Sequence, residues 1–281
     1  MAGSAQPPVG SVVALWRYPV KSMMGEELNA TEVTDRGLVG DRAYAVVDSS
    51  SGKVASAKNP GKWPHLFDFR AALVEVPRPG ASTPPVRITL PDGATVTSAQ
   101  ADVSQILAQA LARSVILEAR DRRPPTAATA EAYWPDMEGL PHRDRVTDFD
   151  LPAETFFDTA VVHLMTTATL DRLRELYPAG RFEVRRFRPN IVVETGNGVK
   201  DFVENAWAGQ TLAIGDAVRL HITRRCIRCV MTTLPQGDLP KDPGILRTAA
   251  RHNQVAVGVY ASVARGGRIA RGDSVRLEAS A

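Results

Sequence analysis

The stretch Gly215-Asp216-Ala217-Val218-Arg219-Leu220 returns near the end of the chain as Gly272-Asp273-Ser274-Val275-Arg276-Leu277. In both copies a Gly-Asp turn leads into alternating apolar and polar residues, the pattern of a half-exposed β-strand. Two copies are too few for a repeat architecture. They favour a β-barrel or sandwich whose hairpins restart in a similar way. We therefore expect a mainly β (α+β) protein with a few short helices.

Strand-like runs dominate the chain on the N-terminal side of this repeat and between its copies. Alternation, or enrichment in β-branched and aromatic residues, predicts strands at 12–18, 42–48, 53–57, 86–90, 94–97, 115–119, 161–165, 191–194 and 254–263. The runs 42–48 and 53–57, and likewise 86–90 and 94–97, flank short loops with glycine and predict hairpins. Helical spacing predicts helices at 103–111, behind Asp102 as N-cap, at 168–177 and around 245–250.

Residues 120 to 155 have a different texture from the rest of the chain. The run is polar, is interrupted by prolines, and has neither a helical nor a strand period. A long connection or a domain boundary is the expectation, and a functional lid is the less common alternative.

Composition limits the classes of function. Of the 281 residues, 44% are hydrophobic and 23% are charged, and 34 basic against 31 acidic residues give a net charge of +3. Such a small excess does not indicate nucleic-acid binding. Two cysteines cannot form a disulfide framework, no apolar run has the length of a membrane span, and the N-terminus lacks the pattern of a secretory signal. We expect a cytoplasmic protein with no membrane partner and a short flexible leader at 1–9.

Both cysteines lie in the segment Arg224-Arg225-Cys226-Ile227-Arg228-Cys229. Fixed positive charge favours a thiolate, which is the form of cysteine that attacks electrophiles or binds a soft metal. Residues three apart on a strand face opposite sides, so Cys226 and Cys229 are not expected to share one pocket. A redox Cys-x-x-Cys pair and half of a zinc site are weaker hypotheses, and packing is the plain alternative. A single reactive or metal-binding thiolate fits best.

Basic and polar residues gather at the predicted strand ends. Lys21-Ser22 closes the first strand, Arg42 opens the next, and Arg188 stands in a cluster that ends at Asn190. Lysine and arginine suit a phosphate, and asparagine suits the edge of a heterocycle. For any one of these residues, ordinary surface charge is the better interpretation, but the clustering raises the odds of a site.

Three further residues have two interpretations each. Thr166 precedes the predicted helix at 168–177, and we expect it to cap that helix, with contact to an anionic ligand as the second possibility. Asp158 is expected in a turn rather than in a polar site, and His163 is expected in the core.

Several of these pieces occur together in an order typical of one family. The motifs are Tyr18-Pro19-Val20-Lys21-Ser22, Gly40-Asp41-Arg42, Arg186-Phe187-Arg188-Pro189-Asn190, Trp207-Ala208-Gly209, Ile214-Gly215-Asp216, Cys226-Ile227-Arg228-Cys229 and Gly272-Asp273-Ser274-Val275. From about residue 10 to 278 the chain resembles MOSC-domain proteins of the two-part kind, which includes the amidoxime reducing components and their bacterial relatives. The resemblance implies an N-terminal β-rich module at 10–125 and a β-barrel MOSC domain at 126–279.

The resemblance also implies a cofactor, molybdenum held by a pterin dithiolene with a terminal phosphate, in the cleft between the two parts. Matching motif positions place Cys229 on the metal, with Cys226 nearby but not a ligand. They place Lys21, Ser22 and Arg42 at the phosphate and tail, and Arg188 and Asn190 beside the pterin. Thr166 matches more loosely a position near the cofactor.

The implied reaction is the two-electron reduction of small N-hydroxylated compounds such as amidoximes, hydroxylamines and N-hydroxylated bases. Some bacterial relatives carry a fused iron–sulfur domain, but two cysteines cannot hold such a cluster. A separate electron-transfer protein is therefore expected as partner, either a ferredoxin, a flavoprotein or a cytochrome b5-like protein. Rival hypotheses are a non-catalytic carrier of the cofactor, a sulfur-transfer protein with a persulfide on Cys229, and a thiol-redox protein using both cysteines.

Overall fold

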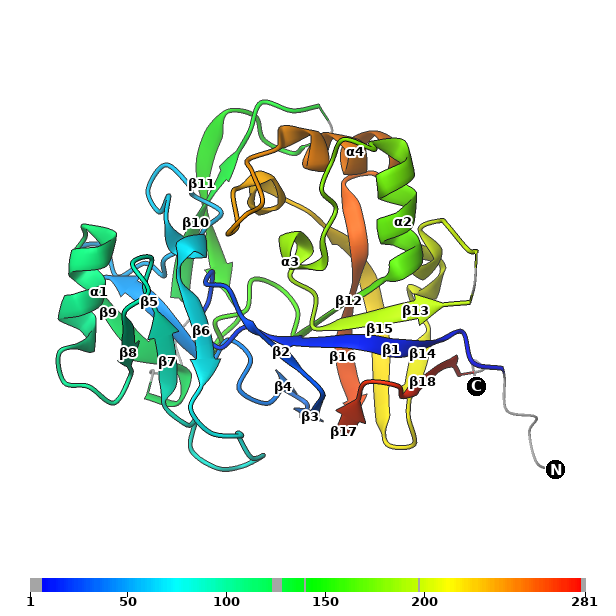
Figure 1. The fold of residues 1–281 in the computed structure, drawn as a ribbon, viewed down its shortest axis with the longest axis horizontal. Coiled ribbons are helices and arrows are strands. Elements are labelled where there is room, and N and C mark those ends of the chain that lie inside the picture. The colour runs from blue at the N-terminus through cyan, green and yellow to red at the C-terminus, as the bar shows by residue number, and fades with distance from the viewer. Residues whose placement is uncertain (1–6, 123–127, 139, 197, 279–281) are drawn as a thin grey trace.

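The computed structural model describes residues 7–122, 128–138, 140–196 and 198–278. Figure 1 shows a β-barrel with helices over one side, and beside it a module of small sheets that carries α1 (Val103–Leu111). The expected mainly β architecture with a few short helices is confirmed.

Seven strands close into the barrel. In order around the ring they are β13 (Ile191–Thr195), β12 (Val162–Thr166), β16 (Ala256–Arg265), β15 (Val218–Ile227), β14 (Thr211–Ile214), β18 (Ser274–Leu277) and β1 (Gly10–Arg17). The pairing of β1 with β13 closes the ring, and every neighbouring pair is antiparallel except β12 with β13. β1 comes from the first residues of the chain and crosses the centre of the molecule in Figure 1.

The repeated Gly-Asp motif explains one side of the barrel. β14 lies between the two strands that follow the motif, and Ile214 is the register partner of both Val218 and Val275. All three side chains are fully buried in the barrel core, where alternate residues of β15 also point. The alternation that predicted the strands is therefore the alternation between core and surface.

Helices pack against the outside of the barrel next to β12, β13 and β16. They are α2 (Thr167–Leu176), α3 (Val184–Phe187) and α4 (Pro243–Asn253). Leu170, Leu173 and Ile245 form their apolar contact with barrel residues such as Val257. The N-cap of α2 is Thr166, whose Oγ1 accepts a hydrogen bond from Thr169 N, so the predicted capping role is confirmed.

Short sheets build the N-terminal module. They are β5 (Tyr44–Asp48) with β9 (Val115–Ala119), and the sheet of β6 (Arg70–Leu73), β7 (Val86–Thr89) and β8 (Thr95–Thr97). A third small sheet, of β17 (Gly267–Ala270), β3 (Ala30–Thr34) and β4 (Gly37–Leu38), packs instead on the barrel core through Val33, Leu38 and Ile269, and β2 (Glu26–Leu28) extends the barrel sheet from β1. The core of the module includes Val230, Met231 and Leu234, which follow Cys229 in sequence. The two parts of the molecule therefore share apolar packing.

The stretch expected as an irregular connection contains a hairpin. β10 (Ala128–Trp134) and β11 (Arg145–Leu151) pair antiparallel along seven residues each. The buried positions of β10 are Ala128, Ala130 and Ala132. Because these buried residues are small, the alternation of buried and exposed positions did not show as an alternation in hydropathy, and the strand was not predicted.

Two other local expectations were met only in part, because Asp102 stands at the N-cap position of α1 and Val54 does bridge to β5. Residues 53–57 form no strand, and Val54 makes only isolated bridges, antiparallel to Val47 of β5 and parallel to Ala130 of β10. The Asp102 side chain makes no capping hydrogen bond to α1. In the described part of the chain, no helix combines the length and the apolar character needed to cross a bilayer.

Candidate functional site

A cavity of about 250 Å³ lies where the N-terminal module meets the barrel. Six of the seven residues expected at the site line it, namely Lys21, Ser22, Arg42, Arg188, Asn190 and Cys229. The seventh, Thr166, is not a lining residue. Its hydroxyl is fully buried, caps α2 and donates a 2.7 Å hydrogen bond to Glu204 Oε2. The structure therefore assigns Thr166 to the helix terminus and not to the cavity.

The two cysteines have different surroundings. Cys229 is half-buried, lines the cavity and stands at the N-cap of the short 3₁₀ turn η4 (Val230–Thr233). Cys226 is fully buried in β15 and does not line the cavity. The expectation that the two sulfurs do not share one pocket is confirmed. Of the two cysteines, only Cys229 offers its thiol to a molecule bound in the cavity.

Arg228, between the cysteines, ties the end of β15 to α3. Its Nη1 lies 2.6 Å from Cys226 Sγ, and its Nη2 donates a 2.8 Å hydrogen bond to the carbonyl of Phe187. Burial lowers the pKa of Arg228, but the nearby sulfurs and Tyr260 outweigh burial and raise that pKa above its usual value. Its Nε is buried and has no partner among the described residues.

Lys21 and Lys58 share one carboxylate inside the cavity. Lys21 Nζ donates to the carbonyl of Phe156 at 2.9 Å and pairs with Asp158, whose other oxygen lies 2.9 Å from Lys58 Nζ. Burial lowers the pKa of Lys21 to about 8. Burial would raise the pKa of Asp158, but the two lysines hold it far below its usual range. Asp158 is thus a charged cavity group, which corrects the expectation of a turn residue.

Asp41 positions two of the predicted residues. It is completely buried and accepts hydrogen bonds from Arg42 Nη1 at 2.6 Å, Asn190 Nδ2 at 2.9 Å and Tyr18 N at 2.7 Å. A buried carboxylate with charged and neutral donors fixes the side chains that it holds. Sequence reasoning quoted Asp41 within Gly40-Asp41-Arg42 but gave it no role.

Arg188 presents an unused donor. Its Nη1 donates to the carbonyl of Met23 at 2.7 Å, and its guanidinium stands 4.1 Å from the centroid of the Tyr18 ring. Burial lowers the pKa of Arg188 to about 9. Its Nη2 is buried and has no partner among the described residues. A buried donor of this kind costs free energy unless an acceptor satisfies it, so an acceptor bound in the cavity would stabilise it.

The backbone is strained at three of the lining residues. Ser22, Arg42 and Arg188 have φ values of 64°, 47° and 54°, in the left-handed region that side chains other than glycine and asparagine rarely adopt. Each such residue costs of order 1–3 kcal/mol, and such residues cluster at functional sites. The Ser22 conformation is held by a 3.0 Å hydrogen bond from Ala57 N to its Oγ.

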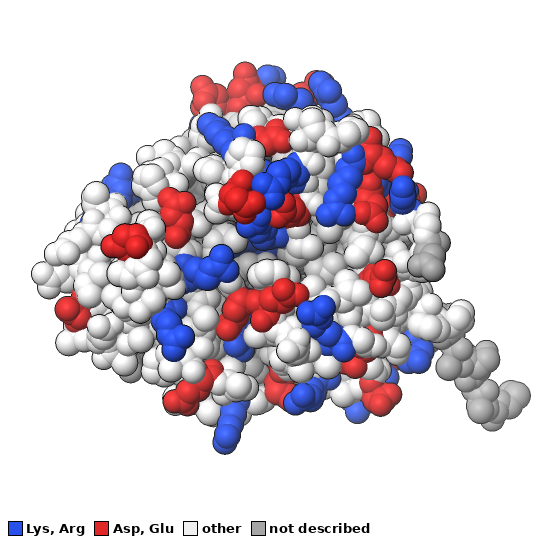
Figure 2. All heavy atoms as spheres, viewed as in Figure 1, with Lys and Arg blue, Asp and Glu red and all other residues white. Residues whose placement is uncertain are grey.

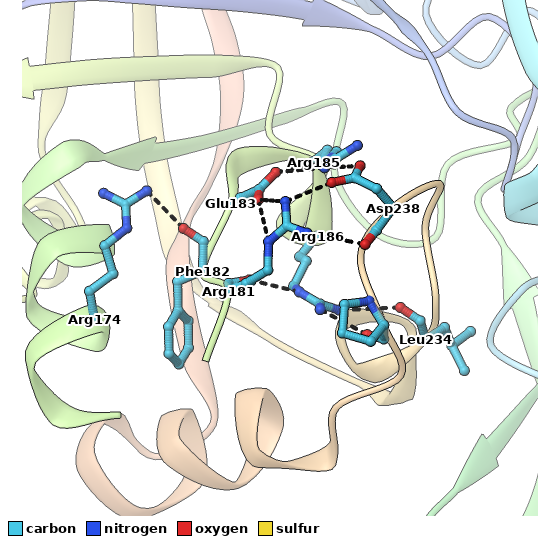
Figure 3. Close-up of polar contacts among 9 residues, drawn as sticks. Arg174, Arg181, Phe182, Glu183, Arg185, Arg186, Leu234 and Asp238 are labelled. Atoms are coloured by element: carbon cyan, nitrogen blue, oxygen red, sulfur yellow. Dashed lines mark hydrogen bonds and ion pairs between the residues drawn. The ribbon is translucent and has the colours of Figure 1, made fainter. Parts of the chain in front are cut away.

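A network of hydrogen bonds from Arg186 holds the segment that follows Cys229. Figure 3 shows the side chain of Arg186 directed from α3 toward this segment. Arg186 is fully buried, and its guanidinium donates to the carbonyls of Arg181, Thr232, Leu234 and Pro240 at 2.8 to 3.3 Å. Outside it, Arg181 and Arg185 form ion pairs with Glu183 and Asp238. Arg186 therefore fixes the Cys229 segment relative to α3 and Arg188.

The cavity concentrates positive charge. Its cationic lining residues are Lys21, Arg42, Lys58, Arg188, Arg224, Arg225 and Arg228, and Asp158 is the carboxylate among the residues that line it. On the face seen in Figure 2, by contrast, basic and acidic side chains are intermixed. No group of three His, Cys, Asp or Glu side chains gathers within the described ranges to hold a metal ion. The site suits an anionic molecule that also uses one sulfur ligand.

Comparison with known families accounts for both parts of the chain. The MOSC N-terminal beta barrel domain matches residues 9–145, and the MOSC domain matches residues 153–276. The chain belongs to the MOSC-domain family. In this MOSC protein Lys21 and Arg42 come from the first match, and Arg188 and Cys229 come from the second. The barrel itself takes β1 from the first match and its other six strands from the second.

Curated relatives are amidoxime reducing components. The mitochondrial amidoxime reducing component 2 of Rattus norvegicus is 26% identical over 238 residues, which cover 80% of this chain and 67% of the relative. Component 1 of Homo sapiens is 24% identical over 248 residues, which cover 80% and 66%. The chain thus spans about two thirds of the length of these relatives. Among solved structures, the YuaD protein from Bacillus subtilis aligns over 97% of both chains with 11% identity and a TM-score of 0.47.

Proposed function

We propose that this MOSC protein binds a molybdenum cofactor in the cavity and reduces small N-hydroxylated compounds. The observation that carries the proposal is the pairing of a single accessible sulfur, on Cys229, with a pocket whose cations greatly outnumber its carboxylates. Thiolate suits a soft, thiolate-rich metal centre, and arginine and lysine suit a phosphate. The names of the curated relatives point to the same reaction.

The residues present fit this group. Arg188 Nη2 and Arg228 Nε are buried donors without partners among the described residues, as an anionic ligand with many acceptors requires. Lys21, Ser22 and Arg42 would hold the phosphate and tail, Arg188 and Asn190 would flank the pterin, and Cys229 would bind the metal. We place this site between the N-terminal module, at 10–125, and the MOSC domain, at 126–279.

When bound, the cofactor supplies the two-electron chemistry that converts N–OH into N–H and water with two protons. The chain contributes position and charge. Asp41 orients Arg42 and Asn190, Arg186 fixes the segment after Cys229, and the shared carboxylate of Asp158 keeps Lys21 and Lys58 side by side. A separate redox protein, either a ferredoxin, a flavoprotein or a cytochrome b5-like protein, would deliver the electrons.

The test begins with freshly purified protein from cells that make the cofactor. Molybdenum is measured by mass spectrometry and pterin by the fluorescence of its oxidised form, and benzamidoxime turnover is followed with reduced methyl viologen as artificial donor. We expect about one molybdenum per chain and conversion to benzamidine. Loaded protein without turnover on any N-hydroxylated compound would favour a carrier. A persulfide on Cys229 without molybdenum would favour sulfur transfer.

A further inference from the structure

Two arginines stand where the cavity opens to solvent. Among the lining residues Thr159, Arg224 and Ile227 are exposed, and they mark the entrance. Arg225 is half-buried beside Arg224 and also lines the cavity. Both arginines belong to β15, a few residues before Cys229, so they lie on the sulfur side of the site. Neither is among the residues that we assign to the phosphate, the pterin or the metal.

Both arginines lie in a part of β15 whose pairing with β16 is irregular. Consecutive residues of a regular strand point to opposite faces. The register of β15 with β16 shifts between Ile222 and Arg224, and again between Arg225 and Ile227. Bulges of this kind re-aim side chains and are common beside active sites. Between the two shifts, Arg224 and Arg225 pair with the consecutive residues Tyr260 and Val259, and both arginines line the cavity.

Three of the seven cavity cations have a carboxylate partner, whereas Arg224 and Arg225, like Arg188 and Arg228, have none among the described residues. Asp158 forms ion pairs with Lys21 and Lys58, and Asp41 forms an ion pair with Arg42. Arg224 and Arg225, by contrast, form no ion pair within the described ranges. Arg225 Nη2 donates to the neutral Gln254 Oε1 at 2.7 Å, and the Arg224 guanidinium lies 5.8 Å from the centroid of the Tyr260 ring.

Apolar surface accompanies this positive charge. Ile227, which lines the cavity, is 51% exposed. Trp134 from β10 lines the same cavity, and its ring is held by a 2.7 Å hydrogen bond from Nε1 to Thr147 Oγ1. A ring or chain could rest on this surface while a charged end reaches the guanidinium groups.

We propose that the N-hydroxylated substrate carries an anionic group, carboxylate or phosphate, that Arg224 and Arg225 bind at the entrance. The inference rests on the proposed function, because it names the substrate class of the same site. Guanidinium groups recognise both kinds of anion through paired N–H donors. The N–OH end of such a molecule would then point inward, toward Cys229.

The test compares matched substrates on the cofactor-loaded protein with reduced methyl viologen as donor. Benzamidoxime is compared with 4-carboxybenzamidoxime, and N4-hydroxycytidine with its 5′-monophosphate, so that the two arms separate carboxylate from phosphate. We expect at least one anionic member to have a kcat/KM about 10-fold above its neutral partner, the effect of one or two charge-assisted contacts. In Arg224→Gln/Arg225→Gln this ratio falls to about one. Arg268→Gln, an exposed charge change on β17, keeps the wild-type ratio.

Calorimetric titration of the same compounds, without any donor, gives a second readout. If no compound is turned over but the anionic member binds more tightly and loses this advantage in the double variant, the proposed reaction fails and the anion site stands. Equal turnover and equal affinity within both pairs would overturn the inference and leave the reaction standing.

Two further results would also overturn the inference. One is a loss of pterin from the double variant, which would place these arginines at the cofactor. The other is an effect seen only with a protein electron donor, which would make them a docking surface for that donor.

Discussion

The Lys21 ammonium group pairs with the Asp158 carboxylate although 137 positions of sequence separate the two residues. Lys21 follows the first barrel strand and Asp158 precedes β12, so the ion pair connects these two segments at the cavity. The same carboxylate holds Lys58 at 2.9 Å. An anion in the cavity would meet two lysines already fixed in place by one neighbour.

The buried Lys21 predicts a specific dependence of stability on pH. Its pKa is about 8 in the folded protein and 10.5 ordinarily. Between these values the unfolded chain holds a proton at this lysine that the folded chain has lost, so the free energy of unfolding rises with pH. Relative to Lys21→Met, we expect the cofactor-free wild type to gain up to about 3 kcal/mol from pH 8 to 10.5. Urea unfolding at a series of pH values measures this difference, and a flat or falling difference contradicts it.

Substituting each cysteine in turn distinguishes metal ligation from dithiol chemistry. In Cys229→Ser the accessible sulfur is lost, and we expect benzamidoxime turnover to fall at least about 100-fold, since even residues that only support metal ligands reach losses of that size. Cys226→Ser, which changes a buried sulfur beside Arg228, keeps its molybdenum and most of its turnover. Metal analysis and methyl viologen assays measure both quantities. Equal loss of turnover in both variants would instead indicate a thiol-redox pair.

The buried Arg186 predicts a large effect from a residue that does not line the cavity. Arg186→Met leaves four carbonyl groups without their donor, and we expect the free energy of unfolding to drop by about 3 kcal/mol or more. The matched control is Arg185→Met, which removes a partly exposed ion pair and should cost less than about 1 kcal/mol. Denaturant titrations measure both. Molybdenum content should also fall in Arg186→Met alone, and full cofactor retention would contradict its positioning role.

Gly258 lies on β16 and has φ of +80°. An added Cβ would come within 2.5 Å of both His163 Nε2 and Leu164 O, so we expect Gly258→Ala to cost about 3 kcal/mol from overpacking and backbone strain together. Gly209 has φ of +83° and no atom within 4 Å of such a Cβ, so Gly209→Ala isolates the strain, about 1 kcal/mol. Thermal unfolding compares the two, and similar melting temperatures would refute the steric argument.

Local sequence patterns predicted most of the strands and the identity of several cavity residues. Lys21, Arg42, Arg188 and Cys229 stand in ordered motifs at strand ends, and strand ends are where a β fold gathers side chains. Thr166 shows what local patterns cannot predict. Its capping role depends only on the adjacent turn of the helix, but whether it lines the cavity depends on the whole fold.

The contacts that the sequence did not predict are mostly between residues far apart in the chain. Nothing near Asp158 indicates that Lys21 will neutralise it, and nothing near Asp41 indicates its bond to Asn190, 149 positions away. The β10–β11 hairpin was missed for a different reason. Alanine is apolar enough to be buried but too small to mark a strand face.

The closure of the barrel by β1 has a consequence for how the chain is made. β1 is synthesised early, yet Gly10 pairs with Thr195 and Val275, which emerge from the ribosome much later. During translation β2 can pair with residues 15–17, but the rest of β1 waits with its hydrogen-bonding groups unsatisfied, the condition in which nascent chains attract chaperones or aggregate. We expect slow, late maturation, with cofactor insertion possible only after the last strand has docked.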